Sequence, residues 1–106
     1  MKTNQVVFAP SAERDLDNLY AYIADHSGEA RAEAFVGRLI DECLGLSAFP
    51  ERGLLRKDIR ANLRTTSFAK RVTVAYAIDE GADTVVVLGV FYGGRDFTHL
   101  ITDENR

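Results

Sequence analysis

The stretch that most constrains the fold runs from Thr84 to Asp96 and reads TVVVLGVFYGGRD. Residues 85–92 are mostly β-branched or aromatic, a composition that suits a buried strand. Both faces of its pleat are apolar, which requires cover on both faces, or one face in the core and the other against a partner. The pair Gly93-Gly94 ends this apolar run, and a charged pair follows. Such an ending is able to present Arg95 at the end of a sheet, although it also serves simply to end a strand.

Two segments ahead of this strand have the periodicity of amphipathic helices. In the first, residues 10–26, the apolar side chains recur at helical spacing and share one face. Ser11 or a neighbour is expected to cap its start, and Ser27-Gly28 is a stop signal. The second begins at Glu29 and carries a broad apolar stripe that ends before Pro50. Because only a few residues connect the two segments, we expect an antiparallel helical hairpin.

Three shorter segments complete the expected sheet, at residues 5–9, 62–67 and 71–79. The last of these alternates clearly between apolar and small or polar residues, as a strand with one buried face does. The basic loop over residues 49–59 is expected to attach to the core through Leu54 and Leu55. Helices grouped before a meander of strands indicate an α+β fold of order β-α-α-β-β-β, with the helical hairpin on one face of a small antiparallel sheet. The first strand is able to pair with either edge of the meander.

The composition is that of a globular protein, with 46% hydrophobic and 27% charged residues. We expect the 106 residues to form a single domain, with a core over about 5–97 and a polar tail over 98–106. No apolar run has the length that spans a bilayer, and the first ten residues are too short for a signal peptide, so we expect a cytoplasmic protein without a membrane partner. The single Cys43 makes neither an internal disulfide nor a metal cage, and no metal or cofactor is expected.

The charge balance argues against a dedicated nucleic-acid binder. The chain has 13 basic and 16 acidic residues, for a net charge of −3, whereas binding to phosphates usually requires a basic excess. Basic residues nevertheless gather in the second half of the chain, so a local basic patch is compatible with the composition. No glycine loop for phosphates is present, because no helix follows Gly93-Gly94. We therefore expect no direct, specific DNA binding by the chain alone.

Four motifs, taken in order, resemble those of one protein family. They are FAPSAERDLDNLYAYIA in the first helix, LSAFPERG after the second helix, NLRTTSFAKRVTVAYAID in the central hairpin, and VVVLGVFYGGRDF at the end. Together they resemble the ParE-type toxins of the wider RelE/ParE superfamily, over residues 6–97. The resemblance implies a bacterial toxin of a type II toxin–antitoxin module, held inactive by a cognate, ParD-like antitoxin. Antitoxins of this kind fold a flexible segment onto the toxin, as a helix in a groove or as an added strand.

The resemblance leaves two activities open, because both branches of the superfamily share one fold. ParE-type toxins bind DNA gyrase, which implies no catalytic residues. For this reading we expect the target- and antitoxin-binding surface to include Arg64, Arg71, Tyr92, Arg95, Asp96 and Phe97. RelE-type toxins cleave messenger RNA at the ribosome. A third possibility is a member without toxicity that acts only as a binding partner.

A RelE-type ribonuclease would need cations around the phosphate and a proton donor for the leaving oxygen. The residues available for this reading are Arg56, Lys57, Arg64, Arg71, Arg95 and His99. Phe97 stands where that branch is expected to carry a tyrosine, and a phenyl ring transfers no proton. The acidic balance also disfavours approach to a polyanion. We therefore favour the gyrase-binding reading.

Two residues of the first helix have simple structural explanations. Tyr22 lies off the apolar stripe, so we expect it on the surface, where an amphipathic aromatic side chain suits an interface. His26 stands near the C-terminal end of the helix, where a cation is favoured by the helix dipole.

Overall fold

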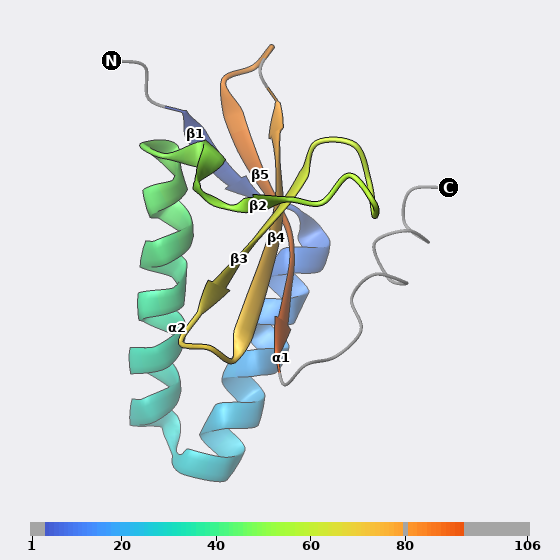
Figure 1. Cartoon of the computed structure of the whole chain (residues 1–106). Helices are drawn as coiled ribbons and strands as arrows, with labels where there is room; N and C mark the ends of the chain where they lie inside the picture. The colour runs from blue at the N-terminus through green and yellow to red at the C-terminus, as the bar shows by residue number, and fades with distance from the viewer. Residues whose placement is uncertain (1–3, 80, 93–106) are drawn as a thin grey trace.

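A computed structural model describes residues 4–79 and 81–92 of the chain. In chain order its elements are β1 (Gln5–Phe8), α1 (Pro10–Ser27), α2 (Glu29–Leu44), the 3₁₀ turns η1 (Gly45–Ser47) and η2 (Pro50–Arg52), β2 (Leu54–Leu55), β3 (Leu63–Phe68), β4 (Val72–Asp79) and β5 (Thr84–Tyr92). The predicted α+β order is therefore confirmed (Figure 1), with one addition, the two-residue strand β2.

The strands form one sheet in the order β1-β5-β4-β3-β2. Strands β3 to β5 pair antiparallel, as predicted, and the added strand β2 pairs antiparallel with β3. Strand β1 pairs in parallel with β5, so that Gln5 lies opposite Thr84. The pairing of β1 makes the sheet mixed. It also places β5 between two hydrogen-bonded neighbours inside the sheet.

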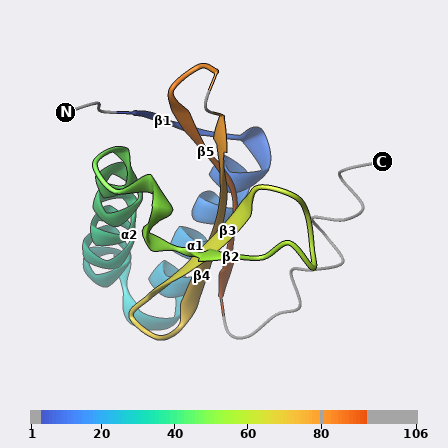
Figure 2. The same cartoon turned by 45° about the horizontal axis from the view of Figure 1, so that its top comes forward.

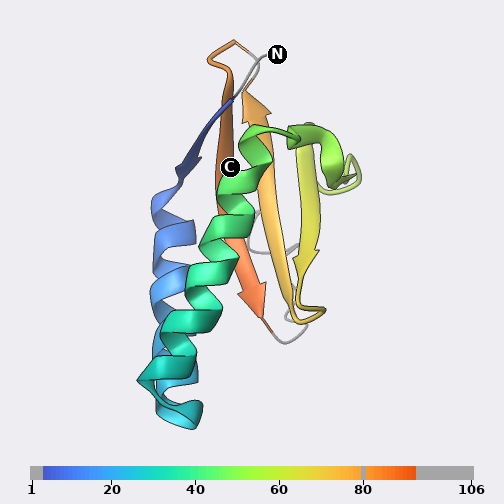
Figure 3. The ribbon, with the colours of Figure 1, turned by 90° about the vertical axis from the view of Figure 1, so that its left-hand side faces the viewer.

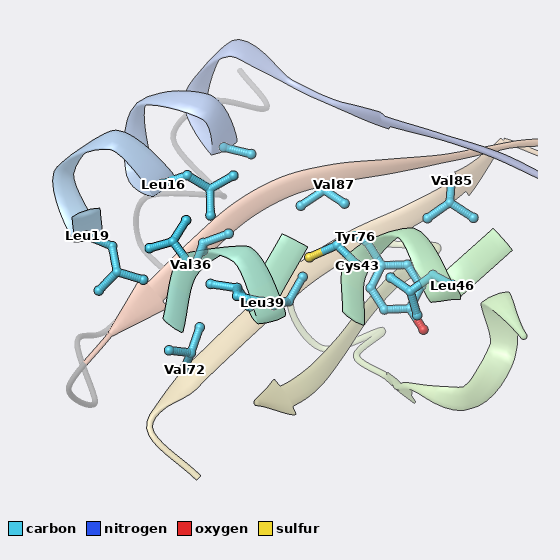
Figure 4. Packing of buried hydrophobic residues seen from close by; sticks show 13 residues of the cluster. Leu16, Leu19, Val36, Leu39, Cys43, Leu46, Val72, Tyr76, Val85 and Val87 are labelled. Carbon is cyan, nitrogen blue, oxygen red and sulfur yellow. The ribbon is translucent and has the colours of Figure 1, made fainter. Parts of the chain in front are cut away.

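Both helices cover the same face of this sheet. They run antiparallel to each other and form a layer of their own beside the strands (Figure 3). The main core lies between the two layers, where side chains of α1 and α2 meet those of β4 and β5 (Figure 4). Its largest fully buried members include Tyr76, Leu39 and Leu46. The alternation predicted for β4 is confirmed, because the side chains of Val72, Val74 and Tyr76 all belong to this core.

A β-bulge in β5 changes which residues face the helices. Ala75 pairs with Gly89 and Tyr76 pairs with Val87, so Leu88 is an extra residue in β5. An extra residue reverses the inward and outward alternation of the strand beyond it. As a result Val87 and Val90 both contribute to the core under the helices, although they are three residues apart.

The other face of the sheet carries a smaller apolar cluster. Leu63, Ala75 and Phe91 are buried there, and Ile59 and Leu88 pack against them. Ile59 comes from the loop between β2 and β3, which extends away from the helical layer (Figure 2). The predicted cover on both faces of β5 is thus provided by the helices on one side and by this cluster on the other.

Two local expectations were wrong. Ser11 does not cap α1, whose N-cap is Ala9 without a side-chain hydrogen bond; the Ser11 hydroxyl instead donates to the carbonyl of Leu88 at 2.8 Å. Leu54 and Leu55 do not attach their loop to the core, because their exposed fractions are 67% and 37%. In both cases the segment is held instead by hydrogen bonds to or from residues of the sheet, which the local sequence pattern does not indicate.

None of the helices in the described part of the chain is both long and apolar enough to span a membrane.

Candidate functional site

The structure describes five of the predicted site residues, and they fall into two groups. Arg56, Lys57 and Arg64 lie near the start of β3, where Leu55 pairs with Arg64. Arg71 and Tyr92 lie at the opposite end of β4, because Val72 pairs with Tyr92. The remaining predicted residues, Arg95, Asp96, Phe97 and His99, lie outside the described residues.

Arg64 holds the loop before β2. Its Nη1 donates to the carbonyls of Glu51 at 3.1 Å and Gly53 at 2.9 Å. The hydroxyl of Tyr76 acts on the same loop, since it donates to the carbonyl of Pro50 at 2.8 Å and accepts from the amide of Gly53 at 3.0 Å. Burial raises the pKa of Tyr76, which keeps its hydroxyl a donor. These four bonds attach the loop to the sheet in place of the leucines.

Arg56 is also engaged within its own loop. Its Nε and Nη2 donate to the two carboxylate oxygens of Asp58 at 3.1 and 3.0 Å. These bonds lower the pKa of the Asp58 carboxyl. A depression of about 500 Å³ beside Arg64 is lined by both signs of charge, because Glu51 and Asp79 also line it. At this end of the sheet, Arg56 and Arg64 are therefore both engaged in contacts with loop residues.

Arg71 follows a turn with an unusual backbone. Ala69 and Lys70 both adopt left-handed conformations, with φ of 55° and 60°. The amide of Arg71 donates to the carbonyl of Phe68 at 3.2 Å and closes this turn. Left-handed backbone is costly for residues other than glycine. The turn thus fixes Arg71 at the end of the sheet, beside Tyr92.

Around Arg71 lies a hollow of about 340 Å³ between the helical hairpin and the end of the sheet. Four of the side chains that line it are basic, namely His26 of α1, Arg31 and Arg38 of α2, and Arg71; we refer to it as the basic hollow. No carboxylate lines it among the residues of 4–79 and 81–92. Within the same ranges, none of its three arginines forms a side-chain hydrogen bond or an ion pair.

Aromatic and aliphatic side chains form the rest of the lining. Tyr22 stacks on His26 with ring centroids 4.2 Å apart and approaches Tyr92 at 5.6 Å. Ile23 and Phe35 are half-buried in the same hollow, so part of its surface is apolar. Tyr22 is 47% exposed, which confirms its predicted surface position. The basic hollow therefore combines an apolar floor with a cationic rim.

The predictions from sequence missed the contribution of the helices to this hollow. Arg31 and Arg38 are seven residues apart on α2, with Phe35 between them, and Tyr22 and His26 are four apart on α1. Both spacings put the two residues on one face of a helix. A search for basic or aromatic residues at these spacings would have found both pairs. It would not have shown that they meet Arg71.

The residues proposed for a RelE-type ribonuclease do not all lie at one site. Arg64 lies opposite Tyr76, five residues along β4 from Arg71, which is about 16 Å at the rise of a strand. At this separation, the side chain of Arg64 does not contact a phosphate that is bound to Arg71. No group of three or more His, Cys, Asp or Glu side chains suited to a metal ion occurs in the described part of the chain.

Comparison with known families decides the relationship. Residues 6–97 match the family described as "ParE toxin of type II toxin-antitoxin system, parDE". The chain belongs to the ParE toxin family. The ParE resemblance noted in the sequence is thereby confirmed. No match was found among curated protein sequences.

Solved structures agree with this fold at low sequence identity. A chain of the chromosomal ParDE system of P. aeruginosa superposes with a TM-score of 0.74 at 15% identity, covering 86% of this chain and 97% of that one. For the RelBE2 toxin–antitoxin complex of Mycobacterium tuberculosis the TM-score is 0.66 at 24% identity, with coverages of 85% and 98%. For the isolated E. coli RelE toxin it is 0.60 at 14% identity, with coverages of 96% and 97%. Both branches of the superfamily thus share this architecture.

Proposed function

We propose that this ParE-family chain inhibits DNA gyrase by binding it, without catalytic residues of its own, and that a cognate ParD-like antitoxin neutralises it in the bacterial cytoplasm. The observation that carries this proposal is the match to the ParE family over residues 6–97. Solved relatives include toxin–antitoxin complexes, which supports an antitoxin as partner.

The arrangement of cations supports binding over RNA cleavage. A ribonuclease needs several charged groups around one phosphate at the moment of reaction. Here Arg56 is paired with Asp58, Arg64 is bound to loop carbonyls, and Arg71 lies in a separate hollow. A protein interface does not require such convergence, because separate anchors each contribute to affinity.

We propose that the chain works as a single domain and that its binding surface includes Arg71 and Tyr92 in the basic hollow, together with Arg95, Asp96 and Phe97 beyond β5. Arg64 contributes to the same function through the loop that it holds. Arg71 and Tyr92 are suited to an interface, since arginine and tyrosine are both enriched among interface residues with large energetic effects.

Two assays run side by side test the proposal. The purified chain is added to a gyrase supercoiling reaction, with scoring of cleavage complexes, and to a ribosome-dependent messenger cleavage reaction. We expect inhibition of supercoiling and an intact messenger. Coexpression with a candidate ParD-like antitoxin should restore growth to cells that the chain arrests.

The alternatives give different results. Messenger cleavage without an effect on gyrase would replace the proposal with the RelE-type activity. Silence in both assays, with antitoxin binding retained, would indicate a member that acts only as a binding partner. An Arg71→Ala variant should weaken the inhibition of gyrase about tenfold or more if Arg71 is an interface anchor.

A further inference from the structure

We propose that the basic hollow is the receptor for an acidic, amphipathic segment of the cognate antitoxin. In this arrangement the segment places an apolar side chain on the floor formed by Ile23 and Phe35, and its carboxylates on Arg31, Arg38 and Arg71. The inference rests on the proposed function for the existence of an antitoxin, and it adds the site and the chemistry of contact.

The charge of the hollow is the first argument. Three arginines and a histidine line it without a carboxylate among the described residues, in a protein whose net charge is −3. Like charges gathered without counter-charges repel one another, and an anionic partner removes that repulsion. Arginine also binds carboxylates through two parallel hydrogen bonds, which adds geometric specificity.

The spacing of the arginines restricts the partner further. Arg31 and Arg38 are seven residues apart on α2, or about 10.5 Å along a helix. Two carboxylates match this distance if they are seven residues apart on a helix, or about three apart on an extended segment. Arg71 lines the hollow from the start of β4, so it is able to bind a third carboxylate of the same segment.

The floor of the hollow favours a peptide over a nucleic acid. Bases stack on open aromatic faces, whereas here Tyr22 already stacks on His26 and contacts Tyr92. Ile23 and Phe35 offer apolar surface suited to an aliphatic or aromatic side chain. A nucleic acid would also extend its phosphates past the hollow over a protein that is acidic as a whole, while a short acidic segment keeps its charges local.

The test is the affinity of the antitoxin for charge-reversal variants. The antitoxin that restores growth is purified, and its Kd for the wild-type chain is compared with its Kd for R31E/R38E. The matched control is R14E/R60E, which makes the same change of charge at two arginines outside the hollow. Far-ultraviolet circular dichroism and thermal unfolding verify that each variant is folded. A 12-nucleotide single-stranded DNA is the competing probe.

We expect R31E/R38E to weaken antitoxin binding at least about 100-fold, because reversed charges face the carboxylates of the partner. The control should change the Kd less than about threefold, since isolated surface charges contribute little. R31K/R38K should lie between them, because lysine keeps the charge and loses the paired hydrogen bonds. Raising the salt concentration should weaken the wild-type complex more than the R31E/R38E complex.

Other outcomes overturn the inference in distinguishable ways. An unchanged Kd for R31E/R38E, or an equal loss in the control, overturns it and leaves the proposed function intact. DNA binding that R31E/R38E abolishes, with antitoxin binding unaffected, assigns the hollow to nucleic acid instead. Failure of every candidate antitoxin to bind the wild-type chain overturns it together with the antitoxin part of the proposed function. Absence of gyrase inhibition overturns only the gyrase target.

Discussion

At the scale of single residues, the loop before β2 depends on the space available at Gly53. The Gly53 amide donates to the Tyr76 hydroxyl, and a Cβ built on Gly53 would lie 2.5 Å from that oxygen and 2.8 Å from the carbonyl of Thr65. The backbone conformation of Gly53, with φ −79° and ψ 168°, is open to any residue. Contact distance, and not backbone freedom, therefore requires glycine here.

We predict that Gly53→Ala lowers the free energy of unfolding by about 1–3 kcal/mol, because either the loop or the Tyr76 ring has to move. The matched control is Gly37→Ala, at an exposed position of α2 where an added Cβ meets nothing within 4 Å. This control should raise stability by about 0.5–1 kcal/mol, since alanine favours a helix. Urea unfolding measures both variants, and equal effects would contradict the role of Gly53.

Cys43 gives a prediction for the dependence of stability on pH. Burial raises the pKa of its thiol from 9.0 to about 11, with a smaller effect from Glu42. Between these pH values the folded chain holds a proton that the unfolded chain has lost, so stability is complete below pH 9 and falls as the pH rises toward 11. This increase in the pKa of Cys43 corresponds to a total loss of about 2.7 kcal/mol in the free energy of unfolding. Comparing urea unfolding of the wild type and Cys43→Ala from pH 8 to 11 isolates this loss; parallel curves would contradict it.

At the scale of elements, α1 supplies hydrogen bonds where the edge strand β1 ends. The carbonyl of Val87 in β5 accepts a hydrogen bond from the amide of Ala9, the residue that follows β1. Beyond it, Ser11 donates to the carbonyl of Leu88, and the amide of Val90 donates to Oδ2 of Asp15 at 2.9 Å. Two helix side chains thus satisfy the backbone at the bulge and fix α1 against the sheet.

We predict that Asp15→Ala lowers the free energy of unfolding by about 1.5–3 kcal/mol, because it removes a hydrogen bond to a charged acceptor and leaves the Val90 amide without this partner. Asp17→Ala, at an exposed position on the same helix, should change stability by less than about 0.5 kcal/mol. Thermal unfolding of the two variants gives the comparison. A similar loss in both would mean that only the charge of α1 matters.

The elements show how far the sequence predicts this fold. Periodicity predicted the first helix, the start of the second and the long strands within one or two residues, since each of these buries a regular apolar face; the end of the second helix was placed only before Pro50, and α2 ends at Leu44. It did not place β1 or reveal the extra residue Leu88, because both depend on pairing between distant segments. Leu54 and Leu55 were misplaced because polar bonds from Arg64 and Tyr76, which no local pattern encodes, hold their loop. Of the residues that line the basic hollow, Arg71 and Tyr92 were among the predicted site residues, while the helix residues reach the hollow only by tertiary packing.

At the scale of the whole molecule, the chain is a two-layer scaffold with different chemistry at its two ends. At one end, Arg56 and Arg64 are occupied by contacts that organise a loop. At the other end, the arginines of the basic hollow form no side-chain hydrogen bond or ion pair with residues that the structure describes. This separation is why we interpret the ParE-family chain as a binding protein whose target and antitoxin are recognised by surface chemistry.

The measurement that tests this interpretation most directly is a titration of purified gyrase with the chain, read as supercoiling activity at several times after mixing. We predict that inhibition saturates once the chain matches the gyrase concentration, provided both exceed the Kd, and that longer incubation does not deepen it. Progressive inactivation by much less than one chain per gyrase, or full activity at a tenfold excess of the chain, would contradict the account.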